Sequence, residues 1–198
     1  MQTLGLASAP QPSDGMFKRL FWPTIQNAYD VDLVGQQGFW VCVAIAVLSA
    51  AVLVVTAHPL IGLLVAATYV LGGIGVRERS ISAAVLVFLG YLIDKIATAL
   101  VQGVGNPLIG LVALMLLFAN VRATVLSKRW HDQDSVAAAE EMPERLTTSF
   151  TDKLANQMPA RIWPKMKFVF FPIASILLLL QIIGIVGIAA MHRVAPPQ

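Results

Sequence analysis

Long uncharged apolar runs limit what this chain can fold into more than any other feature. Residues 38–57 contain no charged side chain and end where His58 precedes Pro59. A bilayer core about 30 Å thick needs about 20 helical residues to cross. Because proline disfavours helix in the residue before it, the run has a defined end. We therefore expect a first membrane span over residues 38–57.

Further runs reach or approach this length. They are residues 60–76, 81–101, 108–121 and 168–191. The run 81–101 is irregular because it carries Asp94 and Lys95, and the short run 108–121 can continue as helix to about Trp130. Only 13% of the residues are charged and 57% are hydrophobic, whereas about a quarter of the residues in a soluble domain are charged. The expected fold class is an all-α integral membrane protein with five transmembrane helices.

The basic residues predict the orientation of these helices. All of the 14 except Lys95 and Arg193 fall before the first span, after the second, or between the fourth and the fifth. Short loops rich in Lys and Arg stay in the cytoplasm, so we expect a cytoplasmic N-terminus and an external C-terminus. The same ends carry the interfacial residues Trp22, Trp40, Trp130 and Trp163. The net charge of +3 then reflects topology, and no nucleic-acid partner is expected.

This topology divides the chain into segments. Residues 16–25 mix aromatic side chains with two cations and suit the membrane surface, and Pro23 is expected to interrupt or end that helix. The expected segments are 1–36 as a cytoplasmic tail containing this interfacial part, 37–126 as a four-helix membrane region, 127–167 as a cytoplasmic loop, 168–191 as the fifth transmembrane helix, and 192–198 as an external tail.

The cytoplasmic loop is expected to contain an amphipathic helix between helices 4 and 5. Its apolar residues recur every four positions, with Pro143 near the start and Pro159 ending the run. They are Met142, Leu146, Phe150, Leu154 and Met158. We favour a helix that packs on the bundle or lies on lipid headgroups over one that binds a protein partner. The loop is too short for a separate catalytic domain.

A polar stripe on the third span is the candidate functional site. At 100° per residue, its members fall within an arc of about 100° on one helix face. They are Tyr91, Asp94, Lys95, Thr98 and Gln102. Ionisable groups inside a membrane are costly and suggest function. The stripe either lines a path for an ion or small solute, or is structural, with Asp94 and Lys95 pairing across helix contacts because adjacent residues pair poorly with each other.

Other polar and small residues suggest helix packing. Tyr69, Asn120 and Gln181 are expected to form interhelical hydrogen bonds rather than a site. The glycines at 72, 73 and 75 either admit a neighbouring backbone or loosen the helix end, and Ala46/Ala50 and Gly62/Ala66 repeat small residues at a spacing of four. Cys42 lies within an apolar run and is expected to be a buried, inert thiol.

Recognisable reactive motifs are missing. His58, His131 and His192 belong to different loops or sides, and HExxH, a Walker-type loop and a GxS motif do not occur. We expect no catalytic residues, no metal and no cofactor. A lipid-modifying enzyme is disfavoured, because no paired acid and base is recognisable near the cytoplasmic membrane surface beyond the scattered Glu140, Glu141 and Glu144.

Two hypotheses about function follow. The favoured one is a non-enzymatic scaffold, assembly or regulatory component of a bacterial inner membrane, which contacts the lipid bilayer and binds a protein partner through residues 131–160. The alternative is a small channel or transporter that uses the polar stripe of the third helix. It is expected to be a homo-oligomer, because five short helices enclose little pathway.

Overall fold

The computed structural model of this chain describes residues 18, 21–25, 28–56, 58–103, 107–133 and 149–194. Over these residues the fold is helical and contains no strand. Five of its helices are long and apolar enough to cross a membrane. They are α2 (Ala28–Val55), α3 (Pro59–Arg77), α4 (Ile81–Gln102), α5 (Leu108–Gln133) and α7 (Met158–Val194). The predicted all-α class and the number of possible spans are thereby confirmed.

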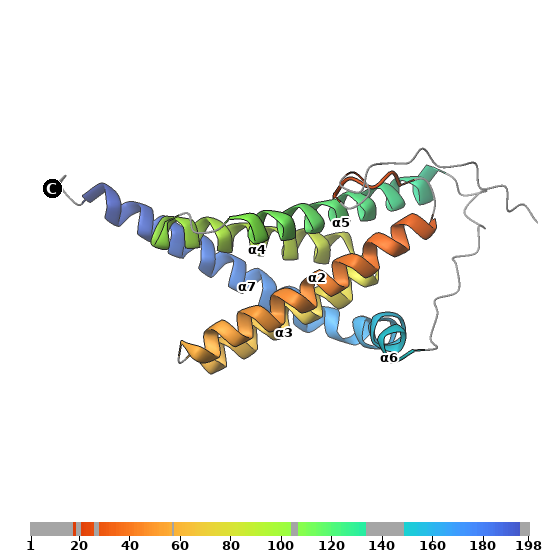
Figure 1. Ribbon diagram of the computed structural model, residues 1–198, viewed down its shortest axis with the longest axis horizontal. Coiled ribbons are helices and arrows are strands. Elements are labelled where there is room, and N and C mark those ends of the chain that lie inside the picture. Colours follow the sequence, from red (N-terminus) through yellow and green to blue (C-terminus); the bar gives the residue numbers. More distant parts are fainter. Residues whose placement is uncertain are drawn as a thin grey trace, which may run out of the picture.

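The five helices alternate in direction, so the bundle has two distinct ends (Figure 1). We call the end where α3 finishes and α4 begins the basic end, because Arg77 and Arg79 lie there, and the opposite end the far end. α2 pairs with α3 and also packs on α5, while α7 packs against α3 and α4. The α2/α3 and α4/α5 pairs lie close together near the basic end and diverge toward the far end (Figure 1).

Several helices extend past the expected spans. Residues 28–36, which we expected in the N-terminal segment, belong to α2. α5 continues through Trp130, as expected. α7 begins at Met158, so its first turns come from the expected loop, and at about 1.5 Å per residue it is much longer than a bilayer core is thick.

The turn between α3 and α4 is a Schellman motif, in which the last carbonyls of a helix accept bonds from the residues that follow it. Ser80 N–H donates to Gly75 O at 3.0 Å, and Arg79 N–H donates to Val76 O at 3.0 Å. Arg79 adopts the left-handed conformation of this motif, with φ of 56°. The Ser80 hydroxyl then accepts from Ala83 N and caps α4. One short turn therefore reverses the chain at the basic end.

The segment before α7 differs from its sequence-based prediction. Ser149 is extended and forms a reciprocal capping box with Asp152, which starts the short helix α6 (Phe150–Asp152). A single helix over 142–158 is therefore wrong, and Met142 and Leu146 lie outside the described residues. Pro159 does not end the helix either: α6 leads through the π-helix η1 (Lys153–Gln157) into α7.

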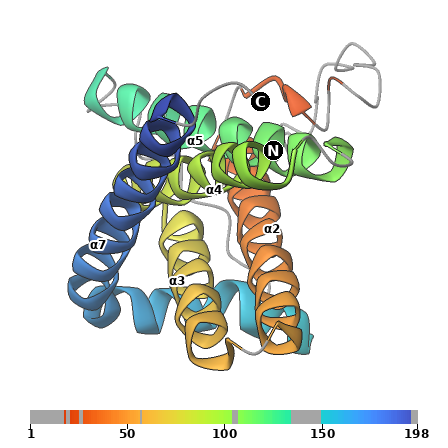
Figure 2. The same cartoon turned by 90° about the vertical axis from the view of Figure 1, so that its left-hand side faces the viewer.

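This segment lies across the basic end of the bundle, behind α2 and α3 in the view of Figure 2. The direction of the chain changes between α6 and the body of α7 (Figure 2), at a place where a π turn is followed by Pro159 and Pro164. Both features are recognised causes of helix bending. Ala155 of η1 is fully buried against Phe39 and Ile74, so the segment is packed onto α2 and α3.

Glycines near the end of α3 allow the helices to pack closely. A Cβ atom on Gly73 would lie 2.8 Å from the Cβ of Cys42 in α2, and one on Gly75 would lie 2.6 Å from the Cβ of Ala83 in α4. Gly72 faces Val87 of α4 and Phe170 of α7. Of the two roles considered for these glycines, close approach is confirmed, because three neighbouring helices occupy the space that side chains would need.

Candidate functional site

The predicted polar stripe lies on the wall of a cleft between the diverging helices. Tyr91, Asp94, Lys95 and Thr98 all line this cleft, whose volume is about 740 Å³. Gln102 is the last residue of α4, but its side chain lies outside the described residues. The structure thus brings the four described members of the stripe to one concave surface.

Asp94 and Lys95 form an ion pair with each other. Lys95 Nζ lies 3.1 Å from Asp94 Oδ2, and it also lies 5.0 Å from the centroid of the Tyr91 ring. The expectation that these neighbours pair poorly was therefore wrong. Adjacent residues of a helix differ by 100° in direction, which separates the Cβ atoms of Asp94 and Lys95. The long, flexible side chain of Lys95 folds back and brings its Nζ to the Asp94 carboxylate.

The pair is only half enclosed, and a nearby hydroxyl is already engaged. The side chains of Lys95 and Asp94 are 39% and 46% exposed. Thr98 donates its hydroxyl to Asp94 O, one helical turn back, at 2.8 Å. Because each charge has a partner and still faces open space, the pair is able to contact a ligand that enters the cleft.

Two polar residues from other helices join the stripe. Tyr69 of α3 and Gln181 of α7 also line the cleft, and the rings of Tyr69 and Tyr91 meet edge to face at 6.4 Å. We had expected these two residues to form interhelical hydrogen bonds. The structure instead places them beside the stripe, where they add neutral hydrogen-bonding groups to its two charges.

The cleft stops at a packed layer on the side of the basic end. Cys42, Val87, Leu117 and Phe170 are buried together there, with exposures of 0–4%. Cys42 is thus a buried thiol, as expected. Side chains from α2, α4, α5 and α7 fill this layer, so the bundle is closely packed on the basic-end side of the cleft.

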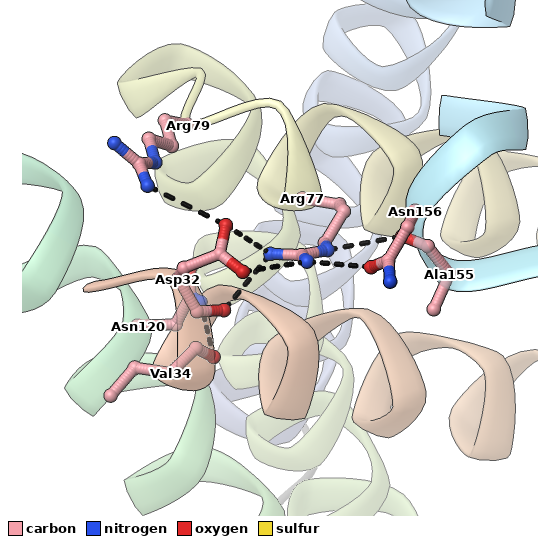
Figure 3. Close-up of polar contacts among 7 residues, drawn as sticks. All are labelled: Asp32, Val34, Arg77, Arg79, Asn120, Ala155 and Asn156. Atoms are coloured by element: carbon pink, nitrogen blue, oxygen red, sulfur yellow. Dashed lines mark hydrogen bonds and ion pairs between the residues drawn. The ribbon is translucent and has the colours of Figure 1, made fainter. Parts of the chain in front are cut away.

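A second polar cluster, which the sequence analysis missed, lies at the basic end (Figure 3). Arg77 of α3 is 1% exposed and forms a two-pronged ion pair with Asp32 of α2. Nη1 donates to Oδ1 and Nη2 to Oδ2, both at 2.8 Å. This parallel geometry is the strongest arrangement of a guanidinium with a carboxylate.

The remaining donors of Arg77 are also used. Nη1 donates to Asp32 O at 2.9 Å, Nη2 to Asn156 Oδ1 at 2.7 Å, and Nε to Ala155 O at 3.0 Å. A guanidinium has five N–H groups, and these bonds satisfy all of them. Arg77 therefore joins α2, α3 and η1 at one point.

The Ala155 carbonyl is available to Arg77 for a reason that lies in the sequence. In an α-helix, this carbonyl would accept a bond from residue 159, which is proline and has no N–H. Arg77 Nε supplies the missing donor. Asp32 and Arg77 flank the first two spans at the same end, so their charges were a usable signal. Pro159 predicts an open carbonyl at residue 155, but nothing in the sequence indicates that η1 packs beside Arg77.

Other polar contacts hold segments together at the same end. Asn120 of α5 donates from Nδ2 to Val34 O of α2 at 3.0 Å (Figure 3), which confirms its expected interhelical bond. Arg122 donates to Pro23 O at 3.0 Å and lies 4.5 Å from the Trp22 ring. The described part of the expected interfacial segment is thus attached to α5.

Among the described residues, no group of three His, Cys, Asp or Glu side chains is placed to hold a metal ion. His58 lies in the turn between α2 and α3, while the side chains of His131 and His192 lie outside the described residues. A comparison with protein-family models, with curated proteins and with solved structures finds no match for this chain.

Proposed function

We propose that this protein is a non-enzymatic component of a bacterial inner membrane that scaffolds, assembles or regulates partners through its α6–η1 segment. In the proposed topology the basic end faces the cytoplasm, because basic loops remain on that side. Five helices able to span a membrane agree with an integral protein. The attachment of α6–η1 to the bundle by Arg77 carries the proposal.

That attachment supports a partner-binding role because it orients one face of the segment inward and the other outward. Ala155 and Asn156 face the bundle and are buried. Phe150 is 79% exposed, and Lys153 and Gln157 are exposed beside it. An exposed aromatic residue next to a cation, held on a rigid base, is suited to binding because little entropy is lost on association.

The test is recovery of crosslinked partners from membranes with the full chain. The double variant Phe150→Ser, Lys153→Glu changes only exposed side chains and leaves the Arg77 contacts in place. We expect it to lose partner recovery, since it removes both the apolar and the basic contact. Lys128→Glu is the matched control, because it makes the same charge change at an exposed position of α5. Equal recovery from the double variant and this control would refute the proposal.

The proposed orientation has a separate test. A cysteine at Lys153 should react with a membrane-impermeant maleimide only after the cytoplasmic side is opened. The natural Cys42 is fully buried, so the expected background is low. Labelling of Lys153→Cys in intact cells would reverse the proposed topology.

The cleft motivates a second candidate function, that of a small oligomeric channel or transporter. Its support is the presence of Asp94 and Lys95 on the wall of a 740 Å³ cleft. Conduction would require the layer containing Leu117 and Phe170 to open. In reconstituted vesicles, flux of protons, cations or small solutes should fall with Asp94→Asn and with Lys95→Ala, and wild-type vesicles without any flux would exclude this function.

A further inference from the structure

The cleft adjoins a second cavity of different character. This cavity has a volume of about 350 Å³ and lies among α3, α4 and α7. Val65, Tyr69 and Gln181 line both cavities, so these three side chains form the boundary between them. Each volume is within the roughly 300–1,000 Å³ usual for small-molecule sites.

The two cavities differ in the chemistry of their walls. The cleft has the Asp94–Lys95 pair, Thr98 and two tyrosines. The second cavity is lined mainly by aliphatic side chains and Phe170, apart from Thr68 and the shared Tyr69 and Gln181. Thr68 is already bonded to Leu64 O of its own helix at 2.8 Å. The cleft, which carries a charged pair on an otherwise largely apolar wall, thus lies beside a cavity without any charge; we call them the polar and the apolar chamber.

Their positions along the helices match the orientation of a lipid molecule. The polar chamber includes Thr98 and Gly103, near the far end of α4, while the apolar chamber includes Val87 and Gly90, earlier in the same helix. A lipid in the leaflet at the far end has its headgroup at that surface and its chains toward the bilayer middle. Along α4 and α7 the polar-to-apolar order of the two chambers follows the same direction, while on α3 the two chambers lie at similar depth.

We propose that these adjoining cavities form a binding site for a zwitterionic phospholipid, with the headgroup at Asp94 and Lys95 and one acyl chain beside Gly90. Lys95 contacts the phosphate, and Asp94 accepts hydrogen bonds from the ammonium group. Two intermolecular ion pairs then replace the single pair between Asp94 and Lys95. The occupant follows from charge complementarity, because the site carries one charge of each sign.

The headgroup determines which lipid is selected. Transfer of an acyl chain from the bilayer into the apolar cavity changes its surroundings little, since lipid tails are as apolar as leucine. Charge-assisted hydrogen bonds are about twice as strong as neutral ones. A lipid with only a phosphate leaves Asp94 facing a second anion, and a diacylglycerol contacts neither charge as an ion.

The experiment uses full-length protein in vesicles of uncharged carrier lipid containing a trace of a photoactivatable probe. The probes are a phosphatidylethanolamine, a phosphatidylglycerol and a diacylglycerol, each with the same diazirine-bearing acyl chain. The crosslinked residue is located by mass spectrometry. We expect the phosphatidylethanolamine to label residues of the apolar cavity most strongly. The double variant Asp94→Asn, Lys95→Gln should reduce that labelling by roughly tenfold, because binding replaces one ion pair with two and the variant loses this net gain of one charge-assisted contact.

Glycine positions supply a matched pair of variants. A Cβ on Gly90 or on Gly184 would meet nothing within 4 Å, so a larger side chain fits at both positions. Only Gly90 lines the apolar cavity. Gly90→Leu should therefore reduce labelling inside the cavity, whereas Gly184→Leu should not.

Equal labelling by all three probes would show only unselective contact with surrounding lipid and would overturn the proposal. Stronger labelling by phosphatidylglycerol would also overturn it, because recognition would then rest on Lys95 alone. Unchanged labelling of Gly90→Leu would exclude the apolar cavity as the chain site. None of these results depends on partner recovery through α6–η1, so failure here is separate from failure of the proposed function.

Discussion

The two clusters of charged residues in this protein differ in how deeply the charges are buried and in how completely they are bonded within the chain. At the basic end, Arg77 is buried and all five of its donors are bonded within the chain. In the cleft, Asp94 and Lys95 are about half enclosed and have each other as ion-pair partners. A charge whose bonds are all internal stabilises the fold, whereas a charge that still faces open space is able to bind.

The largest expected effect is the loss of Arg77. Arg77→Met removes the donors to the partly buried Asp32 carboxylate and to the buried Asn156 and Ala155 oxygens. Removing one partner of a buried ion pair costs about 3–5 kcal/mol. We expect a loss of that size in the free energy of unfolding, measured by titrating the detergent-solubilised protein with SDS.

Two controls sharpen this prediction. Arg77→Lys keeps the charge but lacks the planar, two-pronged guanidinium group. Its free energy of unfolding should therefore lie between those of the wild type and of Arg77→Met. Asp32→Leu combined with Arg77→Met should cost less than the sum of the two single changes, because no unpaired charge remains between them. A loss under about 1 kcal/mol for Arg77→Met, the range of exposed pairs, would remove the distinction between the two clusters.

The next effect tests the close packing that brings the basic end together. Gly73→Val places a Cβ 2.8 Å from the Cys42 Cβ and 3.4 Å from the Phe39 carbonyl oxygen, so α2 and α3 must separate. Overpacking of this kind costs about 1–3 kcal/mol. The same SDS titration measures it. Gly187→Val is the control, because nothing lies within 4 Å of its added Cβ, and equal losses from both variants would contradict the packing seen around Gly73.

A smaller effect is expected in the cleft. Asp94→Asn removes an ion pair between side chains that are 46% and 39% exposed. Such pairs contribute about 0–1 kcal/mol, so the free energy of unfolding should change by no more than this. Asp32→Asn is the natural comparison, since it removes a carboxylate of similar type from the buried cluster. If Asp94→Asn proved as costly as Asp32→Asn, the cleft pair would be structural.

The smallest effect is expected at Arg79, whose side chain is more exposed than that of Arg77 and less exposed than that of Lys95. Arg79→Gly relieves a left-handed backbone with φ of 56° but loses a contact of 3.5 Å to Asp32 Oδ1. Glycine also increases the entropy of the unfolded chain. These effects oppose one another, so we expect a change within about 0.5 kcal/mol in the SDS titration. If Arg79→Gly lowered the free energy of unfolding nearly as much as Arg77→Met, the contact of Arg79 with Asp32 would be as important for stability as that of Arg77.

The sequence by itself determined the helical class and the number of possible spans. Apolar runs such as 38–57 and 60–76 have the length of a bilayer crossing, and hydrophobicity is a local property of the chain. It also placed four described members of the polar stripe on one face, because the helical repeat is fixed by backbone geometry. Local rules were sufficient for both conclusions.

Only the tertiary structure decided which charges are buried and which remain open. Arg77 directly follows one apolar run and Lys95 lies inside another, so the local sequence does not indicate that Arg77 is the buried charge. Arg77 is enclosed because α2 and η1 supply a carboxylate, an amide oxygen and a carbonyl that proline leaves open. Lys95 lines the cleft between helix pairs that diverge toward the far end (Figure 1), so its surroundings depend on contacts between residues that are distant in the sequence.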